Sequence, residues 1–180
     1  MSLRERWITF TFDVATGARW RRLLIAPIGF IIFVTLGSAF IFIAFYLDAI
    51  IPLPKLPHSI VPNIISITLI IVGVILTVWS MICFFKVKGT PVPFNPPPVL
   101  VVHGPYKYAR NPMLTGLFMQ LFGVGLLYRS CALAIIFTPL FIIINVLELK
   151  YIEEPELEKR LGSAYIEYRN KTPMFFPKNL

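Results

Sequence analysis

Long runs of apolar residues alternate with short polar stretches along this chain. Four such runs cover about residues 23–47, 63–85, 112–128 and 131–147. A helix needs about 20 apolar residues to cross a hydrocarbon core about 30 Å thick, and backbone polar groups in lipid must be satisfied within the segment. The pattern predicts an all-α integral membrane protein with four transmembrane helices, forming a single membrane domain over residues 1–180.

Both ends of the chain carry amphipathic patterns. A helix over about residues 3–20 would place Leu3, Trp7, Phe10 and Val14 on one stripe, which suits a segment lying in the membrane interface, although a loosely ordered tail explains the pattern equally well. Residues 153–168 predict a cytosolic amphipathic helix at the C-terminal end. Its apolar side would consist of Leu157, Leu161, Tyr165 and Tyr168.

Two further features sit near this C-terminal helix. Pro155 is acceptable near a helix start but would kink a helix continuing from the fourth span. The apolar residues 173–177 have the composition of an interfacial anchor.

The connections between the spans are informative as well. Residues 89–111 are rich in proline but also contain the apolar run 99–102, so we expect an ordered loop that packs on the helices. The break at Arg129-Ser130 is so short that the third and fourth spans should form an antiparallel hairpin. Such a hairpin brings Arg110-Asn111 and Glu153-Glu154 together at one membrane face.

Charge sets the expected orientation. The formal net charge is +8, but the basic residues flank the apolar runs and do not form one patch, which argues against nucleic acid as a partner. With both termini cytoplasmic, only Lys55 and Arg129 of the 17 Lys and Arg residues lie outside, leaving 15 inside. Two Cys and two His residues, all well separated, offer neither a disulfide framework nor a metal site.

Candidate chemistry is concentrated in one polar stretch, residues 103–116, together with Glu153 and Glu154 downstream. One of these carboxylates could hold a cationic or hydroxyl-rich ligand opposite Arg110 and Tyr106, or the pair could be only a charged helix start. His103 suits either a turn or a ligand contact. Gly123 and Gly125 follow no strand, so close helix packing explains them better than a nucleotide loop.

These residues resemble a known superfamily. The spacing resembles that of the isoprenylcysteine carboxyl methyltransferase and phospholipid methyltransferase superfamily over about residues 86–177. The positions that carry the resemblance are Gly104, Tyr106, Arg110, Asn111, Pro112, Gly116, Glu153, Glu154, Leu157, Leu161, Gly162, Tyr165 and Tyr168.

The resemblance implies a membrane enzyme that uses S-adenosylmethionine, bound at the cytosolic face by the loop over residues 89–111 and the last span. It implies that the cofactor pocket is lined by Leu100, Val101, Val102, His103, Gly104, Tyr106, Arg110, Asn111, Pro112, Met113, Leu114 and Glu153. We assign Arg110 and Glu154 as catalytic residues, and Tyr165, Tyr168 and Arg169 as acceptor-binding residues.

This chain departs from the superfamily pattern at one point. The family's Arg-His-Pro-x-Tyr is here Arg110-Asn111-Pro112-Met113-Leu114, so the imidazole and the phenol are both missing. Asn111 can form hydrogen bonds but cannot act as a general base. Methyl transfer from a sulfonium tolerates this loss if the acceptor is already an anion or a free amine, because catalysis then comes from positioning and water exclusion.

The acceptor itself is left open. A small or lipophilic carboxylate, amine or thiol is compatible with the pattern, and membrane lipids are the expected surroundings. Two other classes compete: an NADPH-dependent membrane reductase of related fold, which should offer more basic residues for the cofactor phosphates, and a non-enzymatic bundle. Oligomeric state is also left open.

Overall fold

The computed structural model describes residues 2–56, 59–90 and 95–176, so residues 91–94 of the predicted loop and residue 177 of the predicted anchor lie outside the described part. This described part is helical and contains no strand. Its α-helices are α1 (Leu3–Thr16), α2 (Arg19–Ile50), α3 (Ile60–Lys86), α4 (Pro112–Leu127), α5 (Thr138–Glu148), α6 (Glu154–Leu161) and α7 (Ser163–Lys171). A 3₁₀ turn, η1 (Gly104–Lys107), and two π-helical stretches, η2 (Ala132–Phe137) and η3 (Leu149–Glu153), complete it.

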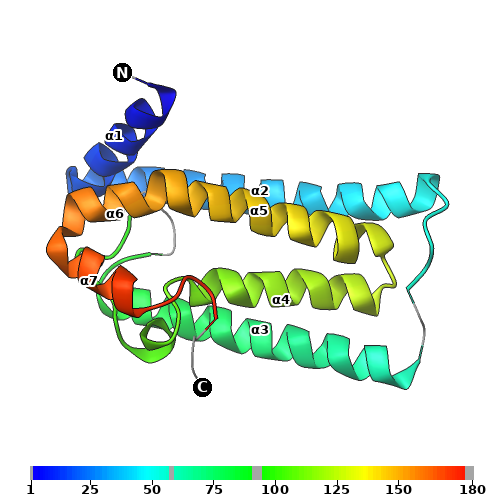
Figure 1. Ribbon diagram of the computed structural model, residues 1–180. Helices are drawn as coiled ribbons and strands as arrows, with labels where there is room; N and C mark the ends of the chain where they lie inside the picture. Colours follow the sequence, from blue (N-terminus) through cyan, green and yellow to red (C-terminus); the bar gives the residue numbers. More distant parts are fainter. Residues whose placement is uncertain (1, 57–58, 91–94, 177–180) are drawn as a thin grey trace.

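Long helices lie lengthwise beside one another (Figure 1). η2, α5, η3 and α6 form one continuous helix from Ala132 to Leu161, which runs next to α2, while α3 and α4 form an antiparallel pair. α1, α6, α7 and the last described residues gather where α3 ends and α4 begins. We call this the site end of the bundle, and the opposite end, where α2 ends and α3 begins, the far end.

Three of these helices are long and apolar enough to cross a membrane: Trp20–Ile50, Ile60–Lys86 and Ala132–Leu161. They confirm the predicted apolar, helical architecture. The third predicted span, α4, is also apolar but has 16 residues, or about 24 Å at 1.5 Å per residue. It is shorter than the others because Asn111 and Tyr128 bound it closely.

Close backbone contact between α3 and α4 depends on glycine. A Cβ atom built on Gly73 would lie 2.6 Å from the carbonyl oxygen of Gly116, and one on Gly123 would lie 2.9 Å from the carbonyl oxygen of Ser66. Gly125 is equally tight, 2.8 Å from the amide nitrogen of Ala134. The prediction that Gly123 and Gly125 allow close helix packing is confirmed.

The helix from Ala132 to Leu161 differs from the two separate segments, 131–147 and 153–168, that the sequence predicts. The chain stays helical through Pro155 and breaks instead at Gly162, whose φ is +61°. Pro155 has no N–H for the carbonyl of Tyr151 four residues earlier, and that carbonyl accepts a hydrogen bond from Arg4 Nε at 3.0 Å. The π-helical η3 precedes the proline, which is where such a register change is expected.

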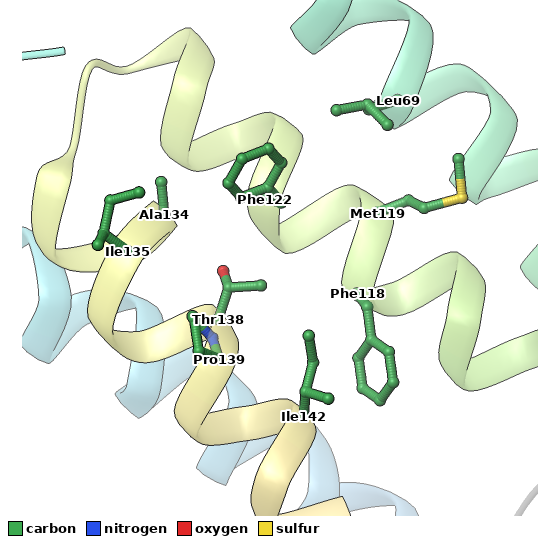
Figure 2. Close-up of a pocket in the computed structure, with 9 residues that line it drawn as sticks. All are labelled: Leu69, Phe118, Met119, Phe122, Ala134, Ile135, Thr138, Pro139 and Ile142. Atoms are coloured by element: carbon green, nitrogen blue, oxygen red, sulfur yellow. The ribbon is translucent and has the colours of Figure 1, made fainter. Parts of the chain in front are cut away.

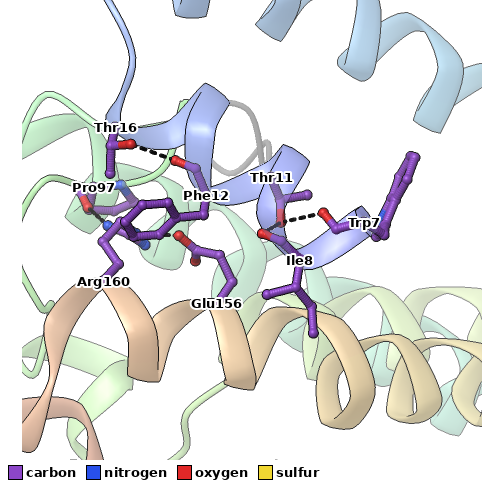
Figure 3. Close-up of polar contacts among 8 residues, drawn as sticks. All are labelled: Trp7, Ile8, Thr11, Phe12, Thr16, Pro97, Glu156 and Arg160. Carbon is purple, nitrogen blue, oxygen red and sulfur yellow. Dashed lines mark hydrogen bonds and ion pairs between the residues drawn. The ribbon is translucent and has the colours of Figure 1, made fainter. Parts of the chain in front are cut away.

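The N-terminal segment is a helix that packs on α6 and η3 (Figure 3). α1 begins with a capping box between Ser2 and Glu5. Its buried residues are Thr11 and Ala15, while Leu3, Trp7 and Phe10 are exposed. The Nζ atom of Lys159 lies 4.1 Å from the ring centre of Phe12, which adds a cation–π contact with α6. Three residues of the predicted apolar stripe are therefore exposed, and the fourth, Val14, is half-buried.

Candidate functional site

The two polar segments of the sequence meet at the site end. Arg110, just before α4, forms an ion pair with Glu154, the first residue of α6, with Nη1 and Oε1 2.5 Å apart. Their side chains are 11% and 12% exposed, so water screens the pair little. The Nε atom of Arg110 is buried and has no hydrogen-bond partner in the described residues. The hairpin argument from the sequence correctly placed these segments together.

Three tyrosines lie at the same end of the bundle, and burial raises the pKa of each above its ordinary value. For Tyr106 the carboxylate of Glu153 adds to the effect, and for Tyr165 that of Glu154 does. For Tyr168 the nearby guanidinium of Arg110 opposes the rise. All three phenols therefore remain neutral at physiological pH, where they can donate hydrogen bonds but cannot act as bases.

The hydroxyl of Tyr168 already has a partner. It donates to the carbonyl oxygen of Tyr106 at 2.6 Å, which ties α7 to η1. The ring of Tyr106 stacks on Phe84 with centroids 4.9 Å apart. Tyr165 is fully buried beneath the same surface. Tyr165 and Tyr168, predicted to bind the acceptor, thus lie at the site end and form part of its walls.

Residues 100–104 of the predicted cofactor loop divide into two groups. Val101 is buried with Tyr106 against Cys83, while Val102 and His103 are exposed. Gly104 has a φ of +62°, and a Cβ atom there would lie 2.9 Å from Cys83 Sγ, so only glycine fits this turn. Leu100 is half-buried, so its exposure is intermediate between those of the two groups. The described part of the loop is ordered and packed on α3, as predicted.

Asn111 is occupied by the end of the chain. Its backbone N–H donates to the carbonyl oxygen of Met174 at 3.0 Å, and its side-chain Nδ2 donates to the same oxygen at 3.4 Å. Pro112 is fully buried as the first residue of α4, and Met113 and Leu114 are half-buried. Of the residues predicted as an interfacial anchor, Pro173 and Met174 accept backbone hydrogen bonds from the residues that precede α4.

Glu153 differs from the other site carboxylates, because the arginine that attracts it, Arg160, is paired with Glu156. It forms no hydrogen bond or ion pair within residues 2–56, 59–90 and 95–176. Its neighbour Glu154 is neutralised by Arg110, and Glu156 by Arg160. Among these three carboxylates, Glu153 is therefore available to a cationic ligand group.

Sequence reasoning missed the pair that holds the loop against α6. Arg160 Nε lies 2.7 Å from Glu156 Oε1, and Arg160 Nη1 donates to the carbonyl oxygen of Pro97 at 2.8 Å (Figure 3). Both side chains are nine-tenths or more buried. The i, i+4 spacing of Glu156 and Arg160 was a visible signal, but it is common on solvent-exposed helices.

Arg169 is engaged elsewhere. It forms an ion pair with Glu158 of α6, and both side chains are about one-third exposed. This contact links α7 to α6 across the break at Gly162. Its guanidinium is thus already paired, which weakens the prediction that it binds the acceptor.

An apolar groove runs between α3, α4 and the helix that begins at Ala132 (Figure 2). Its volume is about 380 Å³. The one hydroxyl in its lining, that of Thr138, donates to the carbonyl oxygen of Leu133 at 2.7 Å and so is already satisfied. The lining consists of Leu69, Phe118, Met119, Phe122, Ala134, Ile135, Thr138, Pro139 and Ile142.

The site end therefore combines three carboxylates, two of them paired with arginines, with neutral phenols beside helices of membrane-spanning length. Such a set can bind a ligand that carries both a carboxylate and a cationic group, with Arg110 and Glu153 as the respective partners. It offers no imidazole for proton transfer at position 111.

Comparison with known families agrees with this reading. Residues 61–164, more than half of the chain, match the family model described as phospholipid methyltransferase. Comparison with curated proteins finds no match, and comparison with solved structures finds none either. The match includes α3, α4, the site loop, the long helix and Glu153. The chain belongs to the phospholipid methyltransferase family, within the isoprenylcysteine and phospholipid methyltransferase superfamily of membrane methyltransferases.

Proposed function

We propose that this protein transfers a methyl group from S-adenosylmethionine to a lipophilic acceptor at the site end of the bundle. The observation that carries the proposal is the buried Arg110–Glu154 pair next to the unpaired carboxylate of Glu153. This charge arrangement lies within the segment that matches the family model.

The residues present suit the cofactor. S-adenosylmethionine supplies an electrophilic methyl group on a sulfonium and carries an α-amino group, a carboxylate and ribose hydroxyls. The buried, unpartnered Nε of Arg110 is a donor for the carboxylate, and Glu153 is an acceptor for the amino group. The neutral phenol of Tyr165 completes a polar wall beside them.

Catalysis by these residues would consist of positioning and exclusion of water. Holding two reactants in a productive geometry can contribute up to about 7–11 kcal/mol in principle. Because Asn111 is no base and the three tyrosines stay protonated, the chain favours an acceptor that reaches the site as a free amine, a thiolate or a carboxylate.

The apolar groove supports a lipophilic acceptor. It is open toward the outer surface of membrane-length helices, and its lining leaves no polar group unsatisfied. A hydrocarbon chain therefore finds there the same medium as in the bilayer, and its polar head could extend toward the site end. Phe118 connects the two regions, since it lines the groove and lies near the start of α4.

For the membrane arrangement we propose four spans, with α4 as the shortest, and both termini cytoplasmic. Support comes from the 15 Lys and Arg residues that this topology places inside, out of 17. The test is labelling of intact cells with an impermeant maleimide. With Cys83 and Cys131 replaced by alanine, Lys55→Cys, at the far end, should react from outside, and Ser163→Cys, at the site end, should react only after lysis. The reverse pattern would invert the topology.

Cofactor binding can be tested by thermal unfolding of the detergent-purified protein with S-adenosylmethionine, S-adenosylhomocysteine and NADPH titrated separately. A ligand at 100 times its Kd should stabilise the folded state by about 2.7 kcal/mol. Saturable stabilisation by the first two and none by NADPH is the expected result. Stabilisation by NADPH alone would support the reductase class, and no response to any of the three would contradict the proposal.

A further inference from the structure

The end of the described chain forms backbone hydrogen bonds with the residues that precede α4. The N–H of Arg110 donates to the carbonyl oxygen of Pro173 at 2.9 Å, and that of Asn111 to Met174 at 3.0 Å. Asn111 Nδ2 is a second donor to the Met174 oxygen, at 3.4 Å. The main chain that carries the Arg110 guanidinium is therefore held by residues more than 60 positions away.

The next residue of the same segment contacts a side chain that lines the apolar groove. The ring of Phe175 lies 5.5 Å, centroid to centroid, from that of Phe118, which lines the groove. Thr115 Oγ1 lies 3.5 Å from the carbonyl oxygen of Phe175. Within three residues, the tail contacts both the charged site and the groove. The neighbouring side chain of Phe176 is 73% exposed.

We propose that residues Pro173–Phe175 act as a strap that positions Arg110 and the groove relative to each other, with Asn111 and Phe175 as its positioning residues. Asn111 holds the strap at the charged site, and Phe175 holds it at Phe118. The catalytic consequence of the strap rests on the proposed methyl transfer. The placement of the strap does not.

The physical reason is that a buried ion pair is favourable only when its geometry is maintained. The Arg110–Glu154 pair links the separate helices α4 and α6, and the strap fixes the backbone on the Arg110 side. A reacting group misplaced by about 1 Å can cost about 10²-fold in rate. An asparagine at position 111 thus has a role that needs hydrogen bonding but no titration.

The placement of the strap can be tested without activity. A nitroxide is attached to Phe176→Cys in a background in which Cys83 and Cys131 are replaced by alanine, and its mobility is measured by electron paramagnetic resonance. Because side chain 176 is exposed, we expect a spectrum of intermediate mobility, limited by the held backbone, that becomes more mobile in Asn111→Ala and in Phe175→Ala. The matched control is Asn170→Ala, because Asn170 is exposed on α7. An unchanged spectrum in Asn111→Ala would overturn the proposal.

The catalytic role is tested with tritium-labelled S-adenosylmethionine and vesicles of phosphatidylethanolamine and phosphatidylcholine. Phe175→Ala should lower kcat/KM for the vesicle lipid about tenfold, and leave the Kd of S-adenosylhomocysteine within about twofold, whereas Phe176→Ala should change neither. A general loss of folded protein would instead reduce the number of binding sites for S-adenosylhomocysteine.

A double-mutant cycle completes the test. If Asn111 and Phe175 act through one strap, the double variant Asn111→Ala/Phe175→Ala should lose about the same tenfold as each single variant, because neighbouring residues that act as a unit are not additive. Additive losses of about a hundredfold would contradict a shared role. Wild-type protein that neither binds S-adenosylhomocysteine nor labels lipid would overturn the proposed function, and the nitroxide spectra would still decide whether the strap exists.

Discussion

Arg110 Nη1 lies 2.5 Å from Glu154 Oε1, which joins the start of α4 to the start of α6. The two residues are brought together because the short turn after α4 reverses the chain and the helix from Ala132 runs back along the full length of the bundle (Figure 1). Both side chains are about nine-tenths buried, so the charge of each is stabilised mainly by the opposite charge of its partner.

Removing one partner of this pair should be costly. Arg110→Ala or Glu154→Ala leaves an uncompensated buried charge, and we expect a loss of about 3–5 kcal/mol in stability. The double variant Arg110→Met/Glu154→Leu should regain much of that loss but should not bind S-adenosylhomocysteine. Thermal unfolding followed by tryptophan fluorescence measures the first effect, and equilibrium dialysis the second. A double variant as unstable as the single ones would show that the pair does not act as a unit.

Glu153 should matter for ligand binding more than for folding. Glu153→Gln keeps the shape of the side chain and removes a carboxyl group that forms no ion pair in the described residues, so the melting temperature should stay the same or rise. The Kd of S-adenosylhomocysteine should rise by at least about tenfold, which corresponds to about 1.4 kcal/mol of binding free energy. Glu167→Gln, an exposed carboxylate on α7, is the matched control. Equal affinity of both variants for S-adenosylhomocysteine would show that Glu153 does not bind the amino group of the ligand.

The α3–α4 contact predicts opposite effects of one substitution at two glycines. Gly73→Ala should destabilise the protein by about 1–3 kcal/mol, because its Cβ atom would lie 2.6 Å from the carbonyl oxygen of Gly116. Gly37→Ala in α2, where nothing lies within 4 Å of the new atom, should be neutral or stabilising by up to about 1 kcal/mol. Thermal unfolding in one detergent compares them directly. Similar melting temperatures would argue against tight α3–α4 packing.

The hydrogen bond from Arg4 to the Tyr151 carbonyl should depend on Pro155. Arg4→Ala should cost about 0.5–1.5 kcal/mol in the wild-type background. In a Pro155→Ala background the helix can supply its own N–H to that carbonyl, so Arg4→Ala should cost close to nothing. The four melting curves of this cycle give the coupling energy. Equal costs in both backgrounds would mean that Arg4 acts elsewhere.

Much of this architecture follows from the sequence. Hydropathy predicts the apolar helices, and the two-residue break at Arg129-Ser130 predicts that Arg110 and Glu154 share one end of the bundle. Gly123 and Gly125 indicate close helix packing, because a nucleotide-binding loop, the alternative for such glycines, would follow a strand. Each of these inferences depends on local pattern or on chain reversal, which the sequence displays directly.

Other features depend on partners that are distant in sequence. Residues 173–177 have the composition of an interfacial anchor whatever they contact, so the hydrogen bonds of Pro173 and Met174 to the site loop could not be predicted. Pro155 suggested a kink, but the rescue of the Tyr151 carbonyl by Arg4 requires α1 to pack on α6. The ion pair between Arg169 and Glu158 likewise depends on the turn at Gly162, which places α7 beside α6.

The most direct test of the central claim is transfer of labelled methyl groups in native membranes. Membranes that contain the wild-type protein are incubated with methyl-tritiated S-adenosylmethionine, and the organic-extractable label is counted and compared with membranes containing Arg110→Ala at equal expression. We predict label in the lipid extract that depends on Arg110 and is suppressed by S-adenosylhomocysteine. Equal labelling in both membranes, or none above that of membranes without the protein, would contradict the account.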